Sequence, residues 1–352
     1  MSDSNARNRY PFTIPAGWFA VAESPDLEVG QTKAAYYFDT PLVIWRDDDD
    51  GVHVQDAFCP HLGAHLGHGG TIEGCEIMCP FHGWKFDAEG ANTDIPYSDR
   101  TNKRAKIRTY PAMERNGFIY AWYHPHEELP TWEVEAVAEL DGTEFSGPKK
   151  THHIVQAGIQ EMAENAVDSA HFRYVHTVAE VPNIEKYEAD GHRAYMESSQ
   201  KFPTPRGVVD GRIDSMADGP GVSIVRFSGI IDTLLVTAST PIDQGQTETR
   251  FHFYVRSLGD DAVNSSVGDA FAAEVDKQFA EDMPIWEHKA HLVRPALADN
   301  DGPFMKFRKW YSQFYAEEIS DDRTVFPPPY WPEKMDETPA KATASARYGD
   351  NP

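Results

Sequence analysis

Short apolar runs separated by turn residues dominate the first third of the chain, a pattern typical of β-strands. Apolar residues at 41–45 and 52–54 flank an acidic turn at 46–51 that ends in glycine, which predicts a β-hairpin. The apolar run 118–123 predicts a buried strand. We therefore expect residues 15 to about 123 to be rich in strand.

The pattern changes after a polar, proline-bounded segment at 124–130, where we place a domain boundary. Helical spacing then predicts helices over 158–171 and 269–288. Between them lie strand-like runs at 221–227, 230–236 and 250–256. This order predicts an α+β domain with a mainly antiparallel sheet.

These patterns divide the chain into two domains and a tail. We expect a first, all-β domain over 10–125 and a second domain over 126–330. The segment 331–352 is poor in apolar residues and predicts a flexible tail.

Charge narrows the classes of partner. The chain has 56 acidic and 32 basic residues among 352, a formal net charge of −24. Such a surface repels phosphate backbones, so nucleic acids and anionic membranes are poor partners. No apolar run approaches the ~18 residues of a membrane span, and the N-terminus lacks the apolar core of a signal peptide. With only three cysteines, we expect a cytoplasmic protein without a disulfide framework.

A first candidate site combines two thiols and two imidazoles. Cys59-Pro60-His61 is followed, after seventeen residues, by Cys79-Pro80-Phe81-His82. Tetrahedral zinc and a Rieske [2Fe–2S] cluster both use two Cys and two His. Zinc fingers usually pair ligands of one type, whereas each segment here offers one Cys and one His. The spacing therefore favours a two-iron cluster held between two loops.

The complete segments, CPHLGAHLGHGG and CPFHGW, resemble those of the Rieske family. The resemblance implies that Cys59 and Cys79 ligate one iron and that His61 and His82 ligate the other. It also implies that Trp84, next to the second histidine, packs over the cluster and limits water access.

Three further residues of this region have no place in the pattern. We interpret Cys75 as a small buried side chain and not as a functional thiol. We interpret His65 and His68 as loop residues without a metal role.

A second candidate site lies near the first predicted helix. Asn165, Asp168 and His171 recur at intervals of three and share roughly one helical face. His176 lies about 140° further round an ideal helix than His171. Both rings therefore reach one metal ion only if the helix ends, kinks or bulges between them.

Asp282 is the candidate third ligand. It lies in an apolar stripe of the second predicted helix, formed by Phe271, Val275, Phe279 and Trp286. A carboxylate buried there needs a cation or hydrogen-bond donors. Alternatively, Pro284 bends the helix and exposes Asp282. Two His and one carboxylate form the facial triad of non-haem Fe(II) oxygenases.

Both motifs together resemble the terminal oxygenase component of Rieske non-haem iron oxygenases, over about residues 10–325. The resemblance implies an N-terminal Rieske domain, a C-terminal helix-grip catalytic domain and a ring-shaped homotrimer. It implies one Fe(II) per subunit, held by His171, His176 and Asp282, and O2 as co-substrate. Asp168 would bridge His171 to the cluster ligand His82 of a neighbouring subunit.

The resemblance also suggests a role for Asn165 and a branch of the family. Asn165 would either contact one of the iron's ligands or lie as a distant fourth neighbour of the iron. The segments 94–97, 282–289 and 301–315 resemble 3-ketosteroid 9α-hydroxylases and cholesterol 7-desaturases. This branch implies a steroid or a similar fused-ring substrate, and we expect Trp286, one turn after Asp282, in the wall of the substrate pocket.

The chain carries no dinucleotide or flavin fingerprint. NAD(P)H electrons would therefore arrive through a separate ferredoxin or flavin–iron–sulfur reductase. Four alternatives stay open: a Rieske electron carrier fused to a lipid-binding module, a zinc-structured binding protein, an oxygenase for aromatic, alkaloid or methyl-group substrates, and a desaturase.

Overall fold

Two small antiparallel sheets form the base of the N-terminal half in the computed structural model. The model describes residues 10–316 except 11, 179 and 205–206, so the predicted tail at 331–352 lies outside the described residues. One sheet has the order β1-β11-β10 and the other the order β2-β3-β4-β9. Their strands are β1 (Gly17–Glu23), β2 (Thr32–Tyr37), β3 (Thr40–Arg46), β4 (Val52–Asp56), β9 (Thr109–Tyr110), β10 (Ala112–Arg115) and β11 (Phe118–Tyr123). The predicted hairpin is confirmed by the β3–β4 pairing, and the predicted buried strand is β11.

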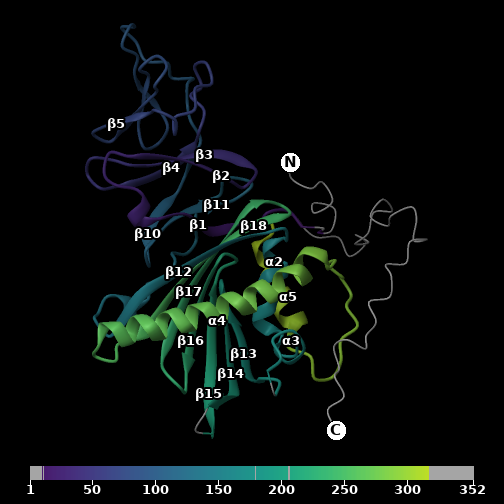
Figure 1. The fold of residues 1–352 in the computed structure, drawn as a ribbon. Helices are drawn as coiled ribbons and strands as arrows, with labels where there is room; N and C mark the ends of the chain where they lie inside the picture. The colour runs from purple at the N-terminus through teal and green to yellow at the C-terminus, as the bar shows by residue number, and fades with distance from the viewer. Residues whose placement is uncertain (1–9, 11, 179, 205–206, 317–352) are drawn as a thin grey trace, which may run out of the picture.

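A third sheet projects from this base and carries the cysteine loops. Its order is β5-β6-β7-β8, and Figure 1 shows it at one end of the molecule. The strands are β5 (Thr71–Glu73), β6 (Glu76–Met78), β7 (Lys85–Phe86) and β8 (Asn92–Asp94). Its core contains Trp45, Leu66, Ile77 and Phe86, all fully buried.

One seven-stranded antiparallel sheet, in the order β12-β18-β17-β16-β15-β14-β13, forms the C-terminal half. Its strands are β12 (Phe145–Val155), β13 (Asn183–Asp190), β14 (Arg193–Thr204), β15 (Gly207–Asp218), β16 (Val222–Ser228), β17 (Thr233–Asp243) and β18 (Gln246–Arg256). The strand expected at 230–236 begins only at Thr233. Together with the helices below, this sheet confirms the predicted α+β class.

The long helix α4 (Asp261–His288) crosses one face of this sheet and packs against β12 and β18 (Figure 1). It begins eight residues before the predicted start because the Asp260 carboxylate caps it, accepting from the N–H groups of Ala262 and Val263. The helix continues through Pro284, so the predicted bend does not expose Asp282, which is 5% exposed.

The helix predicted over 158–171 is wrong as a single element. The structure has α2 (Ile159–Ala163), a 3-10 turn (Glu164–Val167) and α3 (His171–Tyr174), with Asp168 extended between them. The Asp168 carboxylate accepts from the N–H groups of Ala170 and His171. This local capping competes with helix continuation, which explains the break.

The remaining helical elements are short. They are α5 (Phe304–Tyr311) and 3-10 turns at Ser24–Asp26, Ala138–Leu140 and Ser312–Phe314. Within the described part of the chain, no helix is long and apolar enough to cross a bilayer.

The two halves share a core. Trp18 on β1 and Trp122 on β11 pack with Val222, Ile224 and Leu234 of the large sheet. This core joins the base of the N-terminal half to the large sheet, while the cysteine loops lie at the far end (Figure 1).

Candidate metal centres

The two cysteine loops have the same backbone hydrogen bonds. Cys59 N–H donates to Ala64 O at 2.8 Å, and Cys79 N–H donates to Trp84 O at 2.8 Å, each five residues ahead. In return, Gly63 N–H donates to Cys59 O and Gly83 N–H to Cys79 O. Both glycines have a positive φ, +76° and +71°, which explains why glycine follows each ligand pair.

The side chains of these loops fit an iron–sulfur cluster. Cys59 and Cys79 are buried and form no disulfide. Burial raises the pKa of Cys59 to about 11, and the neighbouring Cys79 adds to this rise, so the thiolate form of Cys59 needs a cation beside it. The rings of His61 and His82 are 4.7 Å apart, and Nδ1 of His82 is buried with no hydrogen-bond partner among the described residues. Two thiols, two imidazoles and an orphaned ring nitrogen suit a Rieske cluster.

Trp84 covers one of these histidines. Its ring stacks on His61 with centroids 4.4 Å apart and planes 6° apart. The indole Nε1–H donates to the hydroxyl of Tyr97 at 2.7 Å. Trp84 therefore covers one face of the His61 ring, and its predicted packing over a bound cluster stays a prediction.

The interpretation of Cys75 as buried is wrong. Cys75 is exposed, and its thiol donates to Asp49 Oδ2 at 3.4 Å. It lies in the β5–β6 turn, directly after the exposed Gly74, which has a positive φ of 62°. His65 accepts from Gly67 N–H and packs against His68, as expected of loop residues.

A second group of donors lies between α3 and α4. The ligand atoms of His171, His176 and Asp282 lie within 4.8 Å of one another. Asp282 Oδ2 is 3.4 Å from His176 Nε2 and 4.0 Å from His171 Nε2. Neighbouring ligands of one metal ion, each about 2.1 Å from it, lie roughly 3 Å apart. The spacing therefore suits one shared ion.

The end of α3 makes this convergence possible. The helix stops at Tyr174, and Thr177 has a positive φ of 56°. His176 therefore turns back, and its ring lies 5.1 Å from that of His171 at an angle of 82°.

Unpartnered nitrogens show that this group is suited to a metal. Both ring nitrogens of His171 are buried and have no hydrogen-bond partner within the described residues. Such groups are costly in a dry site unless an ion or a donor occupies the space between them. The set of two His and one carboxylate is the facial triad that holds non-haem Fe(II).

Two neighbours hold the triad in place. Glu281 Oε2 shares a hydrogen bond with His176 Nδ1 at 2.9 Å, which leaves Nε2 free to face Asp282. Burial lowers the pKa of His176, but Asp282 and Glu281 outweigh it and raise the pKa overall. Asn165 Nδ2 donates to Asp282 Oδ2 at 3.3 Å. Glu281 was not predicted from the sequence, although its position directly before Asp282 was an available signal.

Asp168 lies beside the triad. Its Oδ1 is 3.7 Å from His171 Nδ1, and its side chain is 32% exposed. Burial alone would raise the pKa of Asp168. The hydrogen bonds and charge of His171, together with the N–H groups of His171 and Ala170, have a larger effect in the other direction, so the pKa lies below its ordinary value. A carboxylate in this position contacts His171 on one side and remains accessible on the other.

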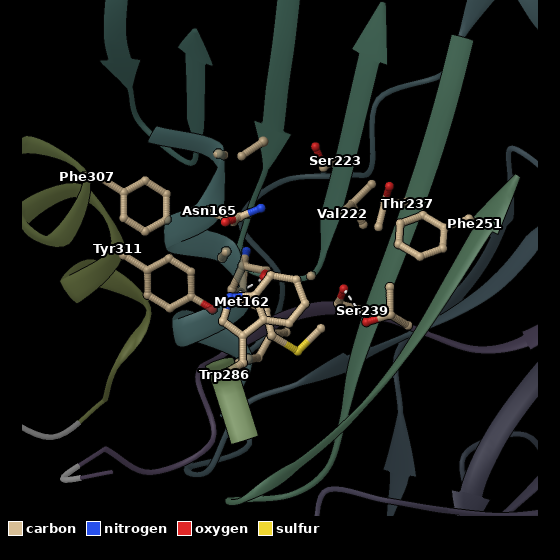
Figure 2. A pocket seen from close by; sticks show the side chains of 18 of the residues that line it. Met162, Asn165, Val222, Ser223, Thr237, Ser239, Phe251, Trp286, Phe307 and Tyr311 are labelled. Atoms are coloured by element: carbon tan, nitrogen blue, oxygen red, sulfur yellow. Dashed lines mark hydrogen bonds between the residues drawn. The ribbon is translucent and has the colours of Figure 1, made fainter. Parts of the chain in front are cut away.

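An apolar cavity adjoins the triad. It has a volume of about 200 Å³, just below the usual range of about 300–1,000 Å³ for ligand pockets. Figure 2 shows Met162, Trp286 and Phe307 on its walls, with Ser223 and Thr237 on the sheet side. Asn165 both lines the cavity and contacts Asp282, so it connects the two.

Comparison with known proteins decides the family. A model of the Rieske [2Fe–2S] domain matches residues 17–111, and a model of the 3-ketosteroid 9alpha-hydroxylase C-terminal domain matches residues 121–315. The chain is a Rieske oxygenase of the 3-ketosteroid 9α-hydroxylase family. It is therefore an oxidoreductase, with the [2Fe–2S] cluster and mononuclear iron that define such enzymes.

Relatives of this oxygenase cover nearly its whole length. The oxygenase component of 3-ketosteroid-9-alpha-monooxygenase from Rhodococcus rhodochrous is 30% identical over 90% of both chains. Cholesterol 7-desaturase from Caenorhabditis elegans is 31% identical over 87% of this chain and 78% of its own. Dicamba monooxygenase bound to dicamba has the same fold, with a TM-score of 0.70 at 18% identity over 88% and 97% of the chains.

The segments that mark this branch of the oxygenases hold the triad's scaffold together. A Cβ atom on Gly302 would lie 1.6 Å from Val167 O, so only glycine allows this approach beside Asp168. Arg308 on α5 pairs with Glu164 at 2.7 and 2.9 Å. Both contacts fix the segment that carries Asn165 and Asp168.

A buried ion cluster joins α2 to the chain after α4. Glu161, 1% exposed, pairs with Lys289 at 2.7 Å and with His291. Burial raises the pKa of Glu161, but His291 and Lys289 lower it to about 2. The cluster holds α2, which precedes the histidines, against the segment that directly follows α4.

Proposed function

We propose that this oxygenase uses O2 to hydroxylate an unactivated C–H bond of a steroid or a similar fused-ring substrate. One observation carries the proposal: the apolar cavity meets the buried facial triad at Asn165. The relatives named for 3-ketosteroids and cholesterol support the substrate class. Desaturation is the second candidate, since one relative is named a desaturase.

His171, His176 and Asp282 would hold the Fe(II), and Asn165 and Glu281 would position these ligands. The iron supplies the binding and reductive activation of O2. Met162 and Trp286 would orient the substrate and exclude water from the reacting carbon. Because the cavity is small, a four-ring substrate would displace these side chains on entry.

Cys59, Cys79, His61 and His82 would hold the cluster that delivers electrons to the iron. The relatives are named as an oxygenase component, which supports a separate ferredoxin or reductase as the NAD(P)H-dependent donor. We assign residues 10–125 to the Rieske domain and 126–330 to the catalytic domain, and we place the enzyme in the cytoplasm, where NAD(P)H is available.

A homotrimer would bring the two centres together. Figure 1 shows the cysteine loops at one end of the chain and α3 in the other half, so electron delivery within one chain would cross the molecule. Exposed apolar side chains surround the cysteine loops, among them Phe58, Leu62 and Phe81, and Tyr174 is exposed on α3. These surfaces suit a subunit contact in which Asp168 reaches the partner subunit's His82.

Anaerobic purification tests this function. We expect a brown protein with about three irons and two acid-labile sulfides per chain, and O2 uptake that depends on a 3-ketosteroid or a sterol. Product analysis then separates an added hydroxyl from a new double bond. A colourless protein loaded with zinc, or iron-replete protein that consumes O2 only with aromatic substrates, contradicts the proposal.

A further inference from the structure

A short basic segment stands out on this acidic chain. Residues 100–108 contain five of the 32 basic residues and no acidic residue, although the whole chain has a net charge of −24. The segment follows β8 and leads into β9, so it lies in the half that carries the cysteine loops. Asp99 is the nearest acidic residue along the chain.

Four of these cations face solvent without partners. Arg100, Lys103, Arg104 and Lys106 are exposed, and none forms an ion pair within the described part of the chain. Arg108 differs, since it is half-buried and pairs with Glu127 at 3.3 Å. Among the residues that the structure describes, these four cations therefore have no acidic partner. We call these four residues the basic loop.

The basic loop borders the covered side of the cluster site. Arg100, Lys103 and Arg104 line a surface hollow together with Trp84, Tyr97 and one carboxylate, Asp99, so the cations outnumber the acidic group there by three to one. Trp84 donates to the Tyr97 hydroxyl at 2.7 Å and stacks on His61 at 4.4 Å. A molecule bound in this hollow would be one indole ring away from a proposed cluster ligand.

We propose that the basic loop is the docking surface for the acidic face of the iron–sulfur protein that donates electrons to this oxygenase. The inference rests on the proposed function and adds the partner's charge and its binding place. Weak redox complexes use small interfaces steered by charge. Transfer at this surface moves one electron: the donor is oxidised by one electron, the ligated cluster is reduced by one, and no bond forms or breaks.

The two sides of the cluster site differ in a way that favours this partner over a second copy of the chain. The exposed ring of Phe81 lies against His82, with centroids 3.8 Å apart, and an apolar side chain of this kind suits a stable subunit contact. The His61 side carries the unpaired cations instead. Electrons would then enter beside His61 and leave beside His82.

A matched pair of double variants tests the docking surface. The test variant is Lys103→Gln/Arg104→Gln, and the control is Lys306→Gln/Lys309→Gln, which removes two exposed cations from α5. The probe is a plant-type [2Fe–2S] ferredoxin with an acidic surface. At low salt we expect about tenfold weaker binding for the test variant, a shallower dependence on ionic strength, and no change for the control.

Two further readouts separate the possible outcomes. Stopped-flow reduction of the cluster by reduced ferredoxin should slow about tenfold in the test variant, while reduction by dithionite should stay unchanged. Unchanged ferredoxin binding overturns the docking proposal, and so does loss of the oligomer in the test variant, which would make the loop a subunit contact. Failure of the proposed function is distinct, because dithionite-reduced wild type would then consume no O2 with a steroid.

Discussion

The amide nitrogen of Asn165 lies 3.3 Å from Oδ2 of Asp282, the same carboxylate oxygen that faces His171 and His176. Asn165 also lines the apolar cavity. One side chain therefore contacts both the proposed iron ligand and the space for substrate.

Replacing Asn165 tests this link. Asn165→Ala should keep its iron, because the three ligands remain, but turn over roughly 10–100-fold more slowly, the usual effect of losing a residue that orients a ligand. Iron content and kcat per iron are the measurements, with the exposed Asn300→Ala as control. Unchanged kcat per iron would show that Asn165 does not position Asp282 for turnover.

Glu281 should control the affinity for iron. Glu281→Ala removes the hydrogen bond to His176 Nδ1 and should raise the Kd for Fe(II) about 10–100-fold. Glu281→Gln keeps an acceptor oxygen, so the Kd for Fe(II) should rise less than in Glu281→Ala. Glu274→Ala, an exposed carboxylate on the same helix, is the control, and the visible spectrum of the cluster should not change in any variant. Equal Fe(II) affinity for all three variants would contradict this role.

Asp168 should affect electron delivery without affecting either metal. Asp168→Asn keeps the shape of the side chain but loses its charge, so re-oxidation of the reduced cluster by O2 and substrate should slow about 100-fold. Stopped-flow absorbance gives this rate, and the iron count and the oligomer mass serve as controls. A fully active Asp168→Ala variant would show that Asp168 is no bridge.

The ion cluster around Glu161 makes a prediction about pH. The pKa of Glu161, about 2, lies below the ordinary value of 4.5. The contribution of its ion pairs to the stability of the folded state is therefore complete above pH 4.5 and is lost as the pH falls towards 2. At pH 7, Glu161→Gln should lower the free energy of unfolding by about 3 kcal/mol, because Lys289 and His291 lose their partner. Urea unfolding of wild type and variant should converge between pH 4.5 and 2. A constant difference over this range would exclude the ion pair as its cause.

Trp286 should influence the size of substrate accepted. Trp286→Phe enlarges the cavity. The ratio of kcat/KM for a steroid to kcat/KM for a smaller bicyclic substrate should therefore rise about tenfold. Trp132→Phe, which lies outside the cavity lining, is the control. The same selectivity in both variants would place the substrate elsewhere.

The sequence predicts well the features that depend on local pattern. The β3–β4 hairpin follows from two apolar runs around one glycine-terminated turn, and β11 from a single apolar run. The cysteine loops carry their own turn signals, since Gly63 and Gly83 occupy positive-φ positions.

Features that depend on side-chain competition or distant contacts were missed. The helix break at Asp168 arises because its carboxylate takes two backbone N–H groups, and no apolar periodicity reports this. The first two turns of α4 were not predicted, because they are polar and show no apolar periodicity. The pairing of Glu161 with His291 joins residues 130 apart, which only the folded chain brings together.

The two cysteine loops share one backbone conformation, yet they place their histidines in different surroundings. Both loops make the same turn over five residues, yet the histidine comes two residues after Cys59 and three after Cys79. This one-residue offset places one imidazole beneath Trp84 and the other beside the exposed Phe81. If the two loops hold the cluster as proposed, this single added residue would give a nearly symmetric site two different sides, one for electrons to enter and one for them to leave.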